Sequence, residues 1–192
     1  MEVFNQLIYD FAAWVDTHQW STALHESFYV YNWVESTHVV ALTLSIGMLF
    51  LIDLRMLGLA MVDIPASTLA RRLSLPMFLG FTVMIITGLL LFYAIPVRSA
   101  QSLWLRIKLV LLFAAAINAW LFHRRMSTAG RSWDTAVKAP MRLQVGASLS
   151  ITFWVLIVIC GRLIAYDWFD CRAEPSSFIA AVAGCVAGQE AF

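Results

Sequence analysis

Four stretches of about twenty apolar residues constrain the fold of this chain more than any other feature. They cover residues 33–54, 76–95, 103–122 and 145–165, and each is bounded by charged, proline or aromatic residues. A helix needs about 20 apolar residues to cross the hydrocarbon core of a bilayer. We therefore expect an all-α fold, in which one membrane-embedded domain of 192 residues forms a four-helix bundle.

The composition supports a membrane environment. Hydrophobic residues make up 61% of the chain and charged residues 13%, whereas soluble domains have about 45–50% apolar and about 25% charged residues. Such an excess requires a non-aqueous solvent, so the lipid bilayer is the first expected partner. The net charge of +1 gives no indication of a nucleic-acid partner.

The distribution of cations predicts an orientation. Cytoplasmic connections of membrane proteins carry an excess of Lys and Arg. One side holds Arg55, Arg71, Arg72, Arg124, Arg125, Arg131, Lys138 and Arg142, and the other holds Arg98, Arg106, Lys108, Arg162 and Arg172. Some cations of the second set lie at helix ends, where they can reach the interface. We therefore expect both ends of the chain, and the connection between the second and third spans, outside the cytoplasm.

Residues 1–27 have a pattern of their own. Apolar side chains recur at i, i+3, i+4 and i+7, which predicts an amphipathic helix at the outer membrane surface. The apolar positions are Val3, Phe4, Leu7, Ile8, Phe11, Trp14 and Val15, and polar residues such as Asn5, Gln6, Asp10 and Asp16 take the other faces. No Lys or Arg precedes Arg55, so we expect no cleaved signal peptide and weak attraction to anionic headgroups. The helix either contacts the membrane or caps the outer end of the bundle.

The expected outer tail, residues 167–192, contains Cys171 and Cys185. The predicted topology places both thiols in an oxidising compartment, where disulfides persist. A bond between them would close a loop of about 15 residues, which stabilises by roughly 3 kcal/mol in the chain-entropy model. The alternative is two free thiols in a loosely ordered tail. Cys160, inside the fourth span, is expected to be a packing residue.

The first span carries several polar residues. Ionisable groups inside a bilayer are costly and usually functional. With about 100° of rotation per residue, Glu35, His38, Ser45 and Asp53 fall within an arc of roughly 80°. We expect this polar stripe to face the interior of the bundle.

Glu35 and His38 form a Glu-x-x-His pair on one face of the predicted helix. The two side chains could bind one metal ion together, as such pairs do in di-iron helical bundles. Glu35 could instead orient His38, which alone would bind haem iron or another metal. Three alternatives remain for His38: a structural hydrogen bond to a neighbouring helix or to water, proton transfer, and contact with a quinone.

The other polar residues of the spans have narrower expected roles. His123 ends the third span beside Arg124 and lies across the membrane from His38, roughly 20 Å away at 1.5 Å per residue. One haem therefore cannot bind both histidines of one chain, and a second ligand would come from another protomer, a partner protein or a residue other than histidine. His123 itself is otherwise an interfacial residue. Asn118 either packs helices together or contacts a buried ligand.

At the inner end of the first span, Asp53 and Arg55 are expected to form a charge network with Arg71 or Arg72.

Three stretches carry a family resemblance. They are residues 33–59 (WVESTHVVALTLSIGMLFLIDLRMLGL), 105–124 (LRIKLVLLFAAAINAWLFHR) and 161–166 (GRLIAY). Together they resemble a bacterial family of small inner-membrane proteins of unknown function. The shared pattern has a Glu-x-x-His start to the first span, a D-L-R-x-L-G end, an R-x-K-L opening of the third span and an F-H-R close. More loosely, the chain is similar to small b-type cytochromes and copper-resistance membrane proteins, which implies haem b or another metal ion at His38.

Two functions follow as expectations. The first is a redox-type inner-membrane subunit that holds haem or a metal near the outer face through His38 and passes electrons between membrane quinone and an outer protein partner. Haem suits a helical bundle because an axial histidine needs only a rigid helix, and the apolar surroundings tune the potential. The second is a cofactor-free accessory or assembly subunit, docked to an outer partner or to further copies of itself.

Overall fold

A computed structural model describes residues 2–128, 133–166, 171 and 176–186 of the protein. Arg131 and Arg172, which contributed to the charge comparison, lie outside the described residues, as does much of the predicted outer tail.

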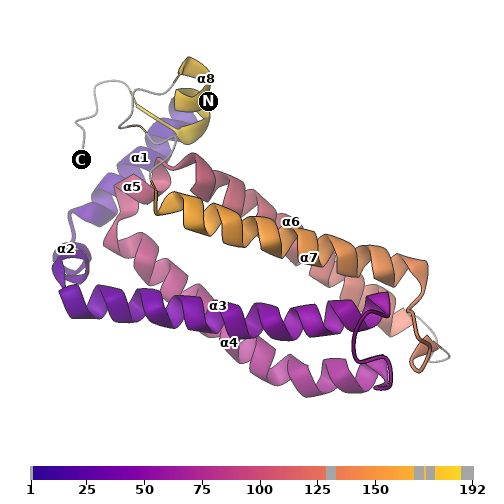
Figure 1. Ribbon diagram of the computed structural model, residues 1–192. Coiled ribbons are helices and arrows are strands. Elements are labelled where there is room, and N and C mark those ends of the chain that lie inside the picture. The colour runs from indigo at the N-terminus through magenta and orange to yellow at the C-terminus, as the bar shows by residue number, and fades with distance from the viewer. Residues whose placement is uncertain (1, 129–132, 167–170, 172–175, 187–192) are drawn as a thin grey trace. The chain divides into compact units, whose positions relative to one another are not determined.

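Throughout the described ranges the chain is helical and forms no strand (Figure 1). The helices are α1 (Glu2–Asp16), α2 (Gln19–Glu26), α3 (Phe28–Leu57), α4 (Ala66–Ala94), α5 (Pro96–Ala100), α6 (Leu103–Thr128), α7 (Met141–Ile164) and α8 (Ser177–Ala183). The expected all-α fold is confirmed.

Four of these helices are long and apolar enough to cross a membrane: α3, α4, the Leu103–Met126 part of α6, and α7. This confirms the four predicted spans and a multi-pass membrane protein. The helices extend beyond the predicted apolar stretches, most clearly in α4, which begins at Ala66 and contains Pro76 inside the helix. Hydropathy marks only the part of a helix that crosses the hydrocarbon, and an internal proline is tolerated in membrane helices because neighbouring groups satisfy the freed backbone carbonyl.

The chain packs into two compact units. The first consists of Met1–Thr37, Ile86–Val110 and Ile157–Phe192, and the second of His38–Ile85 and Leu111–Leu156.

All four long helices contribute to the core of the second unit. Ile52 and Met56 of α3 pack with Ala66 of α4, Leu143 and Ala147 of α7, and partly buried side chains that include Met77 of α4 and Phe122 of α6. At Gly80 the absence of a side chain brings α4 against α3, because a Cβ at this position would collide with the hydroxyl of the fully buried Ser45. Small residues permit such close helix contacts in membranes.

The first unit has a smaller core between α1 and α5. Ala12 of α1 packs against Val97 and Ala100 of α5, with Ile8 and Phe92 at its edge. Residues 1–27 contain the helix α1 and a further short helix, α2, that follows it. The hydroxyl of Ser21 in α2 donates a hydrogen bond of 2.7 Å to the Tyr93 carbonyl oxygen. These contacts fix both N-terminal helices to the end of α4 and to α5.

Candidate functional sites

The polar stripe of α3 is buried unevenly. Ser45 and Asp53 are buried, at 0% and 3% exposure, as predicted for side chains that face a helical core. His38 is half-buried and Glu35 is exposed. Glu35 lies about 60° around the helix from His38, in a part of α3 where Tyr29 and Trp33 are exposed as well. The expectation that the whole stripe faces the interior therefore does not hold at Glu35.

His38 continues the buried face of α3. It precedes Ser45 by seven residues and Ser45 precedes Ile52 by seven, which places the three on one side of the helix because seven residues make about two turns. Ser45 and Ile52 are both buried in the second unit. His38 therefore lies on the packed side of α3, but neighbouring residues cover its imidazole only in part.

In the first unit, Glu35 belongs to a small polar group. Half-buried Tyr31, one turn before it on α3, is close enough to both Glu35 and Arg98 of α5 for electrostatic interaction. Glu35 and His38 are three residues apart in the sequence of α3, but they fall in different units, Glu35 in the first and His38 in the second.

Around His38 the described residues offer one histidine and no set of several metal ligands. Within the described ranges no three His, Cys, Asp or Glu side chains gather where they could hold a metal ion. An axial haem ligand requires one histidine on a rigid helix, which His38 supplies. His123 lies exposed near the end of α6.

Asn118 joins two helices of the second unit. Its side-chain nitrogen donates a hydrogen bond of 2.9 Å to the Gly146 carbonyl oxygen of α7. A Cβ at Gly146 would lie 3.0 Å from the ring of Phe122, so the absence of a side chain allows α6 and α7 to approach at this level. Of the two expected roles, this contact gives Asn118 the packing one.

The guanidinium of Arg55 donates hydrogen bonds to the two connections that lie around the end of α3. Arg55 is 1% exposed. Its Nε donates to the Ile64 carbonyl oxygen at 2.7 Å, and Nη2 donates to the carbonyl oxygens of Asp134 and Ala136, each at 3.2 Å. Nη1 donates to the Val137 carbonyl oxygen at 3.4 Å.

These contacts replace the charge network expected with Arg71 or Arg72, both of which are exposed. The physical reason is that the five donors of a guanidinium match a cluster of turn carbonyls better than they match another cation. Asp134 also caps α4, since its carboxylate accepts hydrogen bonds from the Ser67 backbone nitrogen at 2.7 Å and the Ser67 hydroxyl at 2.6 Å.

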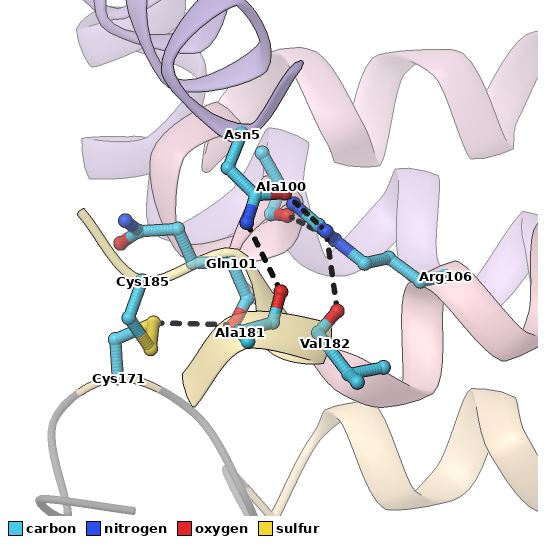
Figure 2. The surroundings of a disulfide bond; sticks show 8 residues. All are labelled: Asn5, Ala100, Gln101, Arg106, Cys171, Ala181, Val182 and Cys185. Atoms are coloured by element: carbon cyan, nitrogen blue, oxygen red, sulfur yellow. Dashed lines mark hydrogen bonds between the residues drawn. A yellow bond between two sulfur atoms is a disulfide. The ribbon is translucent and has the colours of Figure 1, made fainter. Parts of the chain in front are cut away.

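A second guanidinium with several partners, that of the half-buried Arg106 on α6, lies in the first unit (Figure 2). Its Nη1 donates to the side-chain oxygen of Asn5 at 2.8 Å and to the Val182 carbonyl oxygen at 3.1 Å. Its Nε lies 3.5 Å from the Ala100 carbonyl oxygen, and Asn5 donates to the Ala181 carbonyl oxygen at 3.0 Å. Arg106 and Asn5 thereby connect α1, α5, α6 and α8.

The structure joins Cys171 and Cys185 in a disulfide beside this group (Figure 2). The Cys171 sulfur lies 3.8 Å from the Gln101 carbonyl oxygen, which follows α5. Gly184, next to Cys185, has φ +88°, and a Cβ at Gly184 would collide with the Arg106 guanidinium. The disulfide therefore holds the end of α8 beside the Arg106 guanidinium.

The sequence pattern did not identify this group. Asn5 was expected on a polar face of the N-terminal helix, and Arg106 was only counted among the cations of the second side, but both side chains contact α8. One signal was available, because Asn5 lies about 60° from Ile8 and about 20° from Ala12 around the helix, and Ala12 is fully buried. The partner helix α8 lacks the apolar length that made the spans visible.

Comparisons of the chain with protein-family models, curated proteins and solved structures found no match. Fold and composition define the class of protein as an all-helical, multi-pass membrane protein.

Proposed function

We propose that this protein is a redox-type subunit of the bacterial inner membrane that binds haem through His38 near the outer face. The observation that carries the proposal is the position of His38 on α3. It continues the buried face defined by Ser45 and Ile52, yet it is itself only half-buried. A half-buried imidazole at membrane depth offers a nitrogen ligand to a large planar group that lies against the helix.

Each residue of the pair has a role in this proposal. Bound haem would supply one-electron transfer. His38 would hold the iron through one ring nitrogen, and Glu35, one turn away, would accept a hydrogen bond from the other or act as co-ligand. Such a carboxylate fixes the tautomer and orientation of a ligating histidine. The second axial ligand would come from a second protomer or a partner protein, and electrons would pass between membrane quinone and an outer partner.

The proposal includes an orientation. The excess of Lys and Arg in the connections after α3 and α6 favours the cytoplasm for those connections, with both ends of the chain in the periplasm. In that orientation α1 lies at the outer interface. Its side chains Val3, Phe4, Leu7, Phe11 and Trp14 are all exposed, and they would enter the lipid while Gln6 and Asp10 face water.

The test is spectroscopic. The protein is purified in mild detergent, its reduced-minus-oxidised absorption spectrum is recorded, and bound metals are measured. We expect a haem b spectrum that is lost in His38→Ala and kept in His123→Ala, the matched control on α6. A folded, colourless and metal-free protein would refute the proposal, and haem retained by His38→Ala would refute His38 as the ligand.

A second candidate, a cofactor-free accessory subunit, is favoured by a different observation. Large apolar side chains are exposed on three short helices of the first unit: Phe4 on α1, Trp20 on α2 and Phe178 on α8, at 63%, 79% and 76% exposure. The disulfide and Arg106 stabilise the positions of two of these helices, α1 and α8. Crosslinking from Phe178 with a photoreactive residue tests this candidate, which requires a protein adduct or a homo-oligomer; adducts with lipid alone contradict it.

A further inference from the structure

Asp53 is the most deeply buried acid among the described residues. It lies in α3, one turn before Leu57, and only 3% of it is exposed. Ser150 of α7, itself buried, shares a hydrogen bond with its carboxyl group. The second carboxyl oxygen, Oδ2, is fully buried and has no hydrogen-bond partner in the described part of the chain. Neither the His38 proposal nor the packing of the core uses this carboxyl group.

Among the described residues of the surrounding elements, no cation is placed to neutralise Asp53. Arg55 directs its guanidinium to the carbonyl oxygens of Ile64, Asp134, Ala136 and Val137. Asp134 is engaged by Ser67, and His38 lies fifteen residues away along α3, roughly 22 Å at 1.5 Å per residue. The other charged or titratable side chains of the helices and connections around this core are exposed: Asp63, Arg71, Arg72, His123, Arg124, Arg125, Lys138 and Arg142.

A charged carboxylate in this position would be costly. Removing an ionised group from water into a low-dielectric core costs several kcal/mol unless a partner compensates, and one hydroxyl compensates only in part. A metal ion is a poor solution, because hard cations such as Ca²⁺ take 6–8 oxygen ligands, and the observed set is one carboxyl and one hydroxyl. A proton on Oδ2 removes the charge directly.

Ser150 suits both states of such a group. A serine hydroxyl is donor and acceptor at once. It donates to the facing carboxylate oxygen when Asp53 is charged, and it can still donate to that oxygen when the proton is on Oδ2. The hydrogen bond between α3 and α7 therefore persists while the proton leaves or returns.

We propose that Asp53 is an exchangeable proton-binding site inside the membrane domain, with the Ser150 hydroxyl as its hydrogen-bond partner. The reaction is the addition of one proton to one carboxylate oxygen, without electron transfer or any co-reactant. This site is independent of His38 and stands whether or not the protein binds haem.

Infrared spectroscopy of the full chain in lipid nanodiscs tests the proposal. A protonated carboxyl group has a C=O stretching band separate from those of carboxylates and amides. We expect such a band at neutral pH. It should be absent in Asp53→Asn, shifted in frequency in Ser150→Ala, and unchanged in Asp63→Asn, the control at an exposed acid. The band should move on transfer to heavy water and disappear reversibly as the pH is raised.

Two results overturn the proposal. One is the absence at neutral pH of any band that depends on Asp53, which would mean that the group is ionised. The other is a band that responds neither to heavy water nor to pH, which would mean a permanently neutral acid. If Asp53→Asn does not fold, isotope-labelled aspartate in the otherwise unchanged chain, compared with Ser150→Ala, identifies the same band.

Discussion

The guanidinium of Arg106 donates a hydrogen bond of 2.8 Å to the side-chain oxygen of Asn5, across 101 positions of sequence. The same guanidinium reaches the Val182 carbonyl oxygen, and Asn5 reaches Ala181. One half-buried charged side chain thus connects the first helix, a membrane span and the last described helix. Since α8 has only seven residues, these polar contacts are a main part of what holds it in place.

We predict that Arg106→Lys destabilises the protein although it keeps the charge. A lysine ammonium cannot reproduce the forked contacts of a guanidinium, and hydrogen bonds to charged groups contribute about 1.5–3 kcal/mol each. The melting temperature in detergent should fall clearly. Arg162→Lys is the matched control, because Arg162 is exposed and contacts Tyr166, four residues on and just beyond the end of α7. Equal melting temperatures for the two variants would contradict the role assigned to Arg106.

The second prediction concerns the space at Gly184. Its φ of +88° is a left-handed conformation, and an added Cβ would meet the Arg106 guanidinium. For a residue with a side chain, this conformation alone costs roughly 1–2 kcal/mol. Gly184→Ala should therefore lower the melting temperature and increase proteolysis of the C-terminal segment.

Gly47→Ala serves as its control. Gly47 lies in α3, and a Cβ there would have no neighbour within 4 Å. Alanine is favoured over glycine in helices by about 1 kcal/mol, so this variant should melt at or above the temperature of the unmodified protein. A Gly184→Ala variant as stable as Gly47→Ala would show that Arg106 and α8 are not held as described.

The spans were predictable from sequence and the contacts between them only in part. Twenty apolar residues identify a span whatever its partners are, so α3, α4, α6 and α7 were visible at once. The short helices were not, because α5 and α8 are too brief to have a periodic signature. The helical wheel placed Ser45 and Asp53 inside correctly but failed at Glu35, since it gives directions around an axis without telling where neighbouring helices end. The partners of Arg55 are backbone carbonyls, and so are two of the three partners of Arg106, the third being the Asn5 side chain; no side-chain pattern reports contacts with backbone carbonyls.

The third prediction concerns the disulfide. Cys171 and Cys185 are 14 positions apart, and loss of a cross-link of this length costs roughly 3 kcal/mol in the chain-entropy model. Cys171→Ser combined with Cys185→Ser should free α8 from the Gln101 region and expose it to protease, as should a reducing agent on the unmodified protein. Cys160→Ala, which removes the buried free thiol of α7, should leave the reductant effect intact. A double variant as protease-resistant as the unmodified protein would mean that Arg106 and Asn5 hold α8 without the disulfide.

The last prediction addresses Arg55, whose donors go to backbone carbonyls of the two connections. Arg55→Lys should leave several of these carbonyls without a partner, at about 1–3 kcal/mol for each buried group left unsatisfied. Arg71→Lys is the control, because Arg71 is exposed on α4. We expect increased amide hydrogen exchange at residues 133–139 in Arg55→Lys only. Exchange unchanged there would show that the Ala139–Met56 backbone hydrogen bond, 3.1 Å long, and the Asp134 contacts hold this connection without the guanidinium.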